Sequence, residues 1–137
     1  MSTLKVDTIQ HTGGTTGMAL ASNGIVTIQG EGTATTNLQQ GLAKSRIEYT
    51  TAASFVTSAS FNIASLTDGG AGAGYPVFTN NMADTTYSYI GMSNEYSTYG
   101  SATGKATTGY RQFSGRYSDG ANVDVSQNSS IVCGDLA

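Results

Sequence analysis

An all-β fold is the class that this sequence predicts, and three observations predict it. Apolar and polar residues alternate over short stretches, whereas the apolar spacing of an amphipathic helix is nearly absent. Residues that favour strands are abundant, with 8 Tyr among 137 residues and many Thr. Clusters of Gly, Asn and Asp separate the alternating stretches at the intervals of an antiparallel sandwich. We therefore expect a short N-terminal strand and hairpin module followed by an antiparallel β-sandwich.

The N-terminal module is predicted from two stretches. Leu4 to Ile9 begins with the alternation of a half-exposed strand, and Asn23-Gly24 before an apolar stretch is the strongest hairpin signal in the chain. An isolated hairpin is only marginally stable in water, so we expect residues 1–30 to assemble or anchor. Residues 31–45 are predicted to be a linker. The candidate assembly residues are Leu4, Val6, Ile9, Ile25, Val26 and Ile28.

The predicted sandwich covers residues 46–137. Ile47 and Tyr49 alternate with charged residues, which favours a strand over a short helix. Phe61 and Ile63 are expected on one face of a following strand. Asp119-Gly120 predicts a turn between two later strands. The stretch YSYIGMS is predicted to be a strand. One of its faces holds Tyr87, Tyr89 and Gly91, and the other holds Ser88, Ile90 and Met92.

The glycine-rich stretch of Gly69, Gly70, Gly72 and Gly74 lacks the spacing of a nucleotide-binding loop. No choice of start reproduces G-x-G-x-x-G, and no Lys follows as G-x-x-x-x-G-K-[ST] requires. Pro76 disfavours the helix whose N-terminus would hold a phosphate. We therefore expect this stretch to turn the chain, and we expect no cofactor.

The charge pattern disfavours nucleic acid as a partner. The six Lys and Arg are scattered, whereas phosphate binding needs a concentrated basic patch, and the formal net charge is −3. No apolar run approaches the ~18 residues of a membrane span, and no signal peptide opens the chain. We expect no nucleic-acid partner, no membrane insertion and synthesis in a cytoplasm.

The sequence also predicts no enzymatic activity. Nucleophilic catalysis needs a base near the nucleophile, and the single His, His11, is far in sequence from the single Cys, Cys133. Asp119, Asn122 and Asp124 are oxygen donors suited to Ca²⁺, but the closing Glu of a calcium loop is missing. A turn and an alternating strand are therefore favoured there, and we expect no catalytic residue and no metal site.

Four tyrosines in or beside loops rich in Gly and Ser are the candidate surface-binding residues. Tyr with small polar neighbours suits a binding loop. The alternative is that each ring packs at a sheet edge or a subunit interface with a wet hydroxyl, and the sequence leaves both open. These residues are Tyr96, Tyr99, Tyr110 and Tyr117.

Two groups of segments carry a resemblance to known proteins. The first group is STLKVDTIQ, GGTTGMALASNGIVT and LQQGLAK. The second is Ser60 to Asp68, Phe78 to Met82, and Asp84 with Tyr87. Both groups resemble virion structural proteins of tail-fibre type from marine phages, especially cyanophages and pelagiphages. That group often has a Trp soon after GLAK, where this chain has SRIEYT, and residues 96–117 match only in composition.

The resemblance implies a non-enzymatic phage virion structural protein, a short, fibre-like and homotrimeric surface protein. Its partners would be copies of itself and another virion protein of the tail or capsid, bound through the N-terminal module. A capsid decoration protein is one alternative, because 137 residues leave no long shaft. A host-polysaccharide-binding module is another, with the tyrosine loops contacting a host surface glycan.

Overall fold

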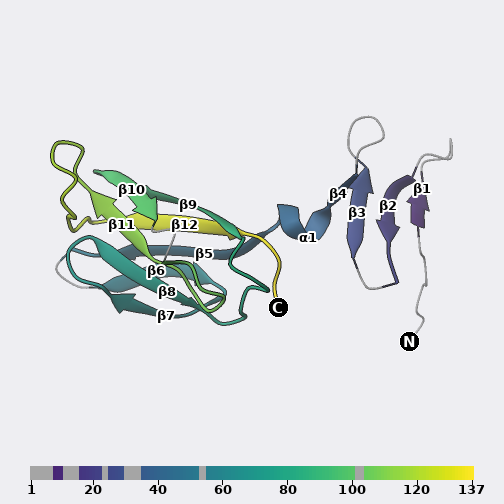
Figure 1. Ribbon diagram of the computed structural model, residues 1–137, viewed down its shortest axis with the longest axis horizontal. Coiled ribbons are helices and arrows are strands. Elements are labelled where there is room, and N and C mark those ends of the chain that lie inside the picture. Colours follow the sequence, from purple (N-terminus) through teal and green to yellow (C-terminus); the bar gives the residue numbers. More distant parts are fainter. Residues whose placement is uncertain (1–7, 11–15, 23–24, 30–34, 53–54, 101–103) are drawn as a thin grey trace. The chain divides into compact units, whose positions relative to one another are not determined.

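The computed structural model describes residues 8–10, 16–22, 25–29, 35–52, 55–100 and 104–137 (Figure 1). These residues form three four-stranded antiparallel sheets and one four-residue helix, so the predicted all-β class is confirmed. The chain divides into two compact units, Met1–Leu42 and Ala43–Ala137. Within the described residues, no helix is long and apolar enough to cross a membrane.

The N-terminal unit contains one antiparallel sheet whose strands follow each other in chain order. Leu20 pairs with Val26 across the segment that contains Asn23-Gly24, so the predicted hairpin is confirmed, although Asn23 and Gly24 lie outside the described residues. The elements are β1 (Thr8–Gln10), β2 (Thr16–Leu20), β3 (Val26–Gln29), β4 (Thr35–Asn37) and the helix α1 (Leu38–Gly41).

The predicted linker at residues 31–45 contains regular elements in its described part, and the boundary between the two units, after Leu42, falls within that range. β4 pairs with β3 from Thr35 to Asn37, α1 follows it, and the next strand begins at Ala43. A ladder of backbone hydrogen bonds needs no large apolar side chain. A composition of small polar residues therefore does not reveal this strand.

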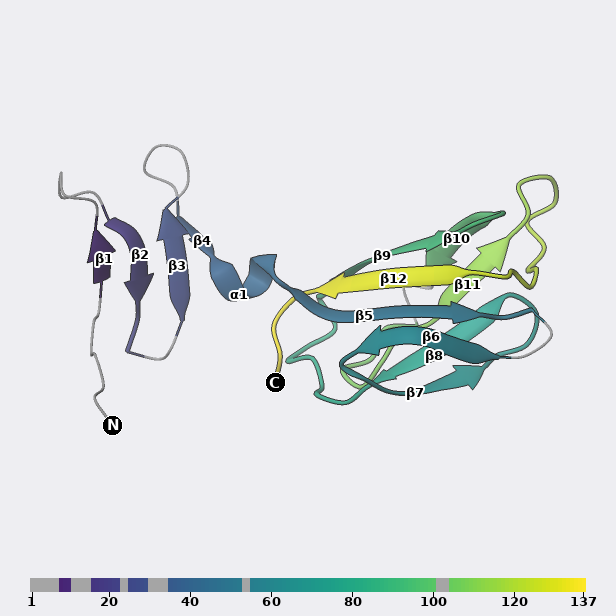
Figure 2. The same cartoon turned by 180° about the vertical axis from the view of Figure 1, so that it is seen from behind.

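The second unit is a sandwich of two four-stranded sheets (Figures 1 and 2). One sheet has the strand order β6-β5-β12-β9, and we call it the β5 sheet; the other has the order β10-β11-β8-β7, and we call it the β8 sheet. The strands are β5 (Ala43–Thr50), β6 (Val56–Phe61), β7 (Ile63–Asp68), β8 (Ala73–Phe78), β9 (Ser88–Ser93), β10 (Ser97–Gly100), β11 (Gln112–Gly115) and β12 (Asn128–Cys133).

A sharp corner at Asn62 carries the chain from the β5 sheet to the β8 sheet. Asn62 has a φ of 56°, a left-handed conformation that Asn tolerates better than most residues. Its Nδ2 donates to the Lys44 carbonyl at 2.9 Å, and its Oδ1 accepts from the Asn80 backbone N–H at 2.7 Å. Phe61 therefore lies exposed on one sheet and Ile63 against the core on the other, so the prediction of one strand with both on one face is wrong.

The glycine-rich stretch forms the turn between β7 and β8, as the sequence predicts. Gly70 and Gly72 have φ values of 91° and 66°, which side chains other than glycine rarely adopt. The Gly70 N–H donates to the Asp68 carboxylate at 2.8 Å, and the Gly72 N–H donates to the Asp124 carboxylate at 2.7 Å. A strand rather than a helix follows the turn.

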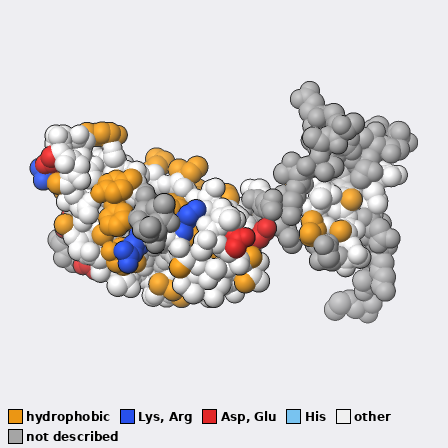
Figure 3. Space-filling view, viewed as in Figure 1, with side chains coloured by type: hydrophobic (Ala, Val, Ile, Leu, Met, Phe, Trp, Pro, Cys, Tyr) orange, Lys and Arg blue, Asp and Glu red, His pale blue; other side chains and the backbone are white. Residues whose placement is uncertain are grey.

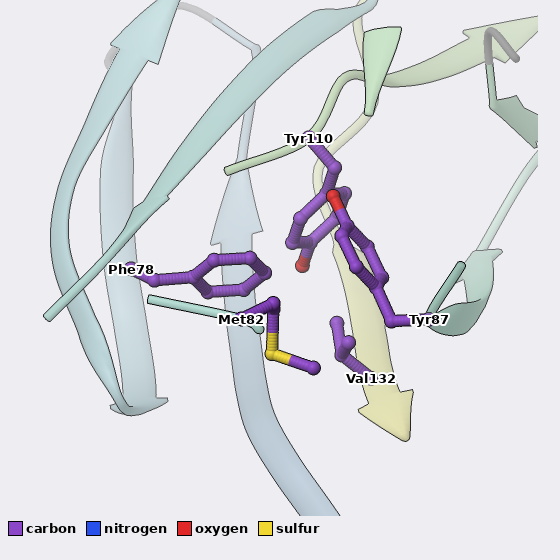
Figure 4. Close-up of a cluster of buried hydrophobic side chains, with 5 residues drawn as sticks. All are labelled: Phe78, Met82, Tyr87, Tyr110 and Val132. Carbon is purple, nitrogen blue, oxygen red and sulfur yellow. The ribbon is translucent and has the colours of Figure 1, made fainter. Parts of the chain in front are cut away.

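The apolar core lies between the two sheets and is built largely of aromatic rings (Figure 4). Phe78 contacts Tyr110 and Tyr87, with ring centroids 5.6 and 5.7 Å apart. The Tyr87 hydroxyl donates to the Gly109 carbonyl at 2.7 Å. The buried cluster consists of Phe78, Met82, Tyr87, Tyr110 and Val132.

Buried polar side chains share the rest of the interior with Ile47, Tyr49 and Val125. The hydroxyls of Tyr110 and Ser130 lie 2.6 Å apart, within hydrogen-bond distance. The Ser114 hydroxyl donates to Asn128 Oδ1 at 2.7 Å, so two further buried side chains from opposite sheets are joined. Buried polar groups cost free energy unless they are hydrogen-bonded, and these bonds meet that requirement for the hydroxyls of Tyr110, Ser114 and Ser130. Among the described residues, four other buried polar atoms have no partner: Ser45 Oγ, the Tyr49 hydroxyl, Gln112 Oε1 and Asn128 Nδ2.

Burial raises the pKa of three core tyrosines. The pKa of Tyr87 rises to about 12, with desolvation as the main cause. Desolvation also raises the pKa of Tyr49 and Tyr110, further than that of Tyr87. All three hydroxyls therefore stay protonated in the folded protein at pH values at which they ionise in the unfolded chain.

The raised values predict a loss of stability at alkaline pH. The stabilisation is complete below about pH 10, the ordinary tyrosine pKa, and falls as the pH rises through 10 to 12. Each buried tyrosine adds a slope of up to about 1.4 kcal/mol per pH unit in that window. Thermal unfolding midpoints followed by circular dichroism from pH 7 to 12 measure this effect. Tyr110→Phe should make the fall shallower, and a midpoint that stays constant through pH 11.5 would contradict the assignment.

A second prediction concerns Gly72, where a side chain would meet backbone. A Cβ on Gly72 would lie 2.5 Å from the Ser114 carbonyl oxygen and 2.7 Å from the Val123 nitrogen. Gly120 has a similar φ of 68° but open space around it, so Gly120→Ala is the matched control for backbone strain alone. We expect Gly120→Ala to cost about 1–2 kcal/mol and Gly72→Ala at least about 2 kcal/mol more, measured by urea unfolding. Equal losses for the two variants would show that the close contact is absent.

Candidate functional site

The described strands of the N-terminal unit carry one apolar face. Ile9 pairs with Met18, and Met18 pairs with Ile28, so these three side chains form one row across β1, β2 and β3. Leu20 and Val26 pair with each other two residues further along and share that face. We call Ile9, Met18, Leu20, Val26 and Ile28 the N-terminal apolar face.

This apolar face is not covered within the described residues. Ile9 is 57% exposed and Leu20 49% exposed. The other three members are half-buried, and no residue of this unit whose exposure is described is buried. A sheet with one apolar face is stable when a second layer covers that face. The N-terminal unit therefore presents a surface that suits a partner.

The structure brings three predicted assembly residues together. Ile9, Val26 and Ile28 lie on the N-terminal apolar face, whereas Ile25 directly precedes β3 and belongs to neither row. Leu4 and Val6 lie outside the described residues. Met18 and Leu20 also belong to this face and were not predicted, although the alternation within TGMAL indicates them.

A second surface feature is a group of aromatic rings on the outer face of the β8 sheet. The rings of Tyr99 and Phe113 are stacked, with centroids 5.4 Å apart and planes 14° apart. Tyr75 meets Phe113 edge to face at 6.5 Å, and the Arg111 guanidinium lies 4.8 Å from the Tyr75 ring centre. We call Tyr75, Tyr99, Arg111 and Phe113 the aromatic surface. Figure 3 shows hydrophobic side chains gathered over β10 and β11 beside Lys and Arg.

Strand alternation places these rings outward. Gln112 and Ser114 are fully buried between the sheets, so Phe113 between them points to the opposite face. Tyr99 pairs directly with Phe113 across β10 and β11 and therefore shares that outer face. The Tyr99 hydroxyl donates to Asn122 Oδ1, which holds the ring over its neighbour.

The three oxygen donors considered for calcium have separate hydrogen-bond roles. Asp119 accepts from the Ala121 N–H at 3.0 Å, Asn122 accepts from Tyr99, and Asp124 accepts from the Gly72 N–H. Within the described residues, no three His, Cys, Asp or Glu side chains are grouped to hold a metal ion. His11 lies outside that part of the chain, and Cys133 is half-buried.

The four predicted binding tyrosines have different environments. Tyr99 belongs to the aromatic surface, Tyr96 is half-buried beside β10, and Tyr117 is 87% exposed in the turn after β11. The prediction for Tyr110 is wrong, because its ring is 2% exposed and packs in the core. Tyr75, Phe113 and Arg111 were not predicted as surface-binding residues. Gln112 and Ser114 on either side of Phe113 point inward, which is the reverse of the usual pattern of apolar residues inside and polar residues outside.

The aromatic surface is suited to binding a flat, partly apolar ligand. Tyr and Phe rings supply apolar faces, Tyr hydroxyls and Asn122 supply hydrogen-bonding groups, and Arg111 supplies a positive charge. Comparison with protein-family models, curated proteins and solved structures finds no match to this chain.

Proposed function

We propose that this chain is a non-enzymatic structural protein of a phage particle. In this proposal the N-terminal unit joins copies to each other and to another virion protein, and the sandwich is displayed. The observation that carries the proposal is the contrast between the two units: the sandwich has a buried core of its own, whereas no residue of described exposure in the N-terminal unit is buried.

The free energy available to the N-terminal apolar face supports an assembly role. Full burial of one such side chain contributes about 1.5–3 kcal/mol relative to full exposure. Five side chains that are exposed or half-buried therefore gain several kcal/mol per copy when a partner covers them. Three copies around one axis would cover their faces mutually, which agrees with the homotrimer that the resemblance implies.

The resemblance to tail-fibre-type proteins favours a short fibre on the tail, and the capsid decoration protein is the alternative. Both place the chain in the virion and differ in location. Antibodies against residues 46–137, imaged on purified particles by electron microscopy, separate them. Label on the tail supports the fibre and label over the head supports decoration, whereas particles without label would contradict the virion assignment.

A substitution on β3 tests the assembly role directly. Ile28→Asp places a charge on the N-terminal apolar face, and Thr27→Asp places the same charge on the opposite face of the same strand. We expect Ile28→Asp chains to be absent from particles and Thr27→Asp chains to be incorporated normally. Near-ultraviolet circular dichroism of the core tyrosines verifies that the sandwich stays folded in both. Normal incorporation of Ile28→Asp would contradict the role given to this face.

The aromatic surface favours a second candidate function, the binding of a host polysaccharide. Sugar rings pack their C–H faces on aromatic rings, and Arg111 beside Tyr75 favours a polysaccharide that carries carboxylate or sulfate groups. This function is compatible with a virion protein, because a displayed sandwich presents its outer faces to the host.

Titration with soluble acidic and neutral polysaccharides measures this binding. We expect Tyr99→Ala and Arg111→Ala to weaken binding of the acidic polymers about tenfold each, which corresponds to about 1.4 kcal/mol. Tyr117→Ala is the matched control, since Tyr117 is exposed but is not part of the aromatic surface. Equal effects of Tyr99→Ala and Tyr117→Ala, or no binding by the unmodified chain, would contradict the second candidate.

A further inference from the structure

The outer face of the β5 sheet carries exposed apolar side chains that the core does not use. Ile90 is 74% exposed and Met92 66% exposed, both on β9. The same face of the other strands adds Val56 and Phe61 on β6 and Ile131 on β12, and these three are also exposed. Exposed apolar patches of this kind mark interaction sites on soluble proteins.

Figure 2 shows β6, β5, β12 and β9 side by side. The register of these four strands arranges the residues of this face in two adjacent rows. Residues directly opposite each other in an antiparallel ladder share a face and lie side by side. The first row is Phe61, Arg46, Ile131 and Ile90, and the second row is Ala59, Glu48, Ser129 and Met92.

We propose that this face packs against the same face of a second copy, related by a two-fold axis that runs between the two rows. Such an axis reverses the strand direction and keeps the strand order. It therefore lays the first row of one copy over the second row of the other, with β5 on β5 and β9 on β9. A two-fold contact of this kind uses the same patch on both copies.

The side chains of the two rows complement each other in this arrangement. Arg46 faces Glu48 of the second copy, and the symmetry repeats this pair of opposite charges. The large Phe61 ring faces the small Ala59, and Ile90 faces Met92, so the apolar positions at both edges meet apolar positions. On β12 Ile131 faces the small Ser129, so three of the four strand positions match in charge or polarity and the fourth matches only in size.

The charges favour a second copy of this chain over a nucleic acid or a strongly charged protein. Arg46 and Glu48 cancel, so the face has no net charge to attract such partners. Among the described residues these two form no salt bridge within the chain, and Glu48 accepts a hydrogen bond from Gln127 Nε2 at 3.1 Å.

The size of the face sets the strength of the contact. Four strands about 4.8 Å apart and about six residues long give a footprint of roughly 19 by 20 Å. This lies below the roughly 800 Å² per partner of a standard-size interface, so we expect a weak dimer. Packed sheets diverge by about 30°, so the register is kept best near the centre, where Arg46 and Glu48 lie. These two residues should therefore decide the pairing.

The pairing does not depend on the proposed function, because it uses a surface on the other unit of the chain. In the proposed function, the N-terminal units determine how many copies form one oligomer. The β5 sheets would then join two such oligomers. Failure of the pairing would leave the virion assignment untouched, and failure of the virion assignment would leave the pairing untouched.

Sedimentation velocity of the full chain over a range of micromolar to millimolar concentrations tests the pairing by charge reversal. We expect the unmodified chain to form a larger species as its concentration rises. Arg46→Glu and Glu48→Arg should each raise the dissociation constant of that species at least about tenfold, because like charges then meet twice. An equimolar mixture of the two variants should restore the larger species, because the doubly acidic face of one variant then meets the doubly basic face of the other.

Arg116→Glu is the matched control, since Arg116 is exposed and lies outside this face, and it should leave the association unchanged. Two results would overturn the proposal: an unmodified chain that stays one species at every concentration, or a mixture that associates no better than the single variants. The mixture separates an effect between copies from an effect on folding, because a folding defect persists on mixing.

Discussion

The close approach of the two sheets in the sandwich is the constraint on which the rest of the structure depends. A Cβ on Gly74 would lie 2.6 Å from the Tyr49 hydroxyl, and one on Gly91 would lie 3.0 Å from the Gln112 side chain. The glycines on one sheet thus make room for long side chains from the other. Gln112 Nε2 donates to the Ser129 carbonyl, and the Tyr110 hydroxyl lies within hydrogen-bond distance of Ser130. Among the described residues, the Tyr49 hydroxyl has no hydrogen-bond partner. A chain with few large apolar residues gains a core in this way.

This way of filling the core explains where the remaining apolar residues lie. Tyrosine, glycine and polar residues occupy the inner positions of β9, β11 and β12 with the exception of Val132. Ile90, Ile131 and Phe113 fall on the outer faces. The N-terminal sheet has a single apolar face and no buried residue among those whose exposure is described. The outward apolar residues of the sandwich are therefore a consequence of how its core is built.

Alternation predicted which residues share a face but not which face is buried. Tyr89 and Gly91 do lie on one face of β9 and Ile90 and Met92 on the other, yet the aliphatic pair is the exposed one. Tyr110, which precedes β11, also lies in the core rather than on the surface. A tyrosine ring can be buried when its hydroxyl finds a buried hydrogen-bond partner. Local patterns could not reveal such inversions, because the partner of Tyr110 lies 20 residues away on another strand.

The turns that require glycine were predicted from the sequence. The corner at Asn62 and most of the aromatic surface were not, because they depend on contacts between residues far apart in the chain. The turn at Gly70 and Gly72 follows from local backbone geometry, and the Asp119-Gly120 turn does also, with Gly120 at a φ of 68°. The corner at Asn62 depends on Lys44 and Asn80, each 18 residues away, so the local sequence looks like one continuous strand. Of the aromatic surface, only Tyr99 could be named, because its other members meet through strand pairing.

Hydrogen exchange of the isolated chain at low concentration, read by nuclear magnetic resonance, tests the central claim most directly. The claim is that the sandwich is complete in itself and that the N-terminal sheet is completed by a partner. The account predicts slow exchange for the amides of β5, β8 and β12, with similar opening free energies, and fast exchange for β1 to β3. Protection of β2 and β3 equal to that of β5 in the isolated monomeric chain would contradict it.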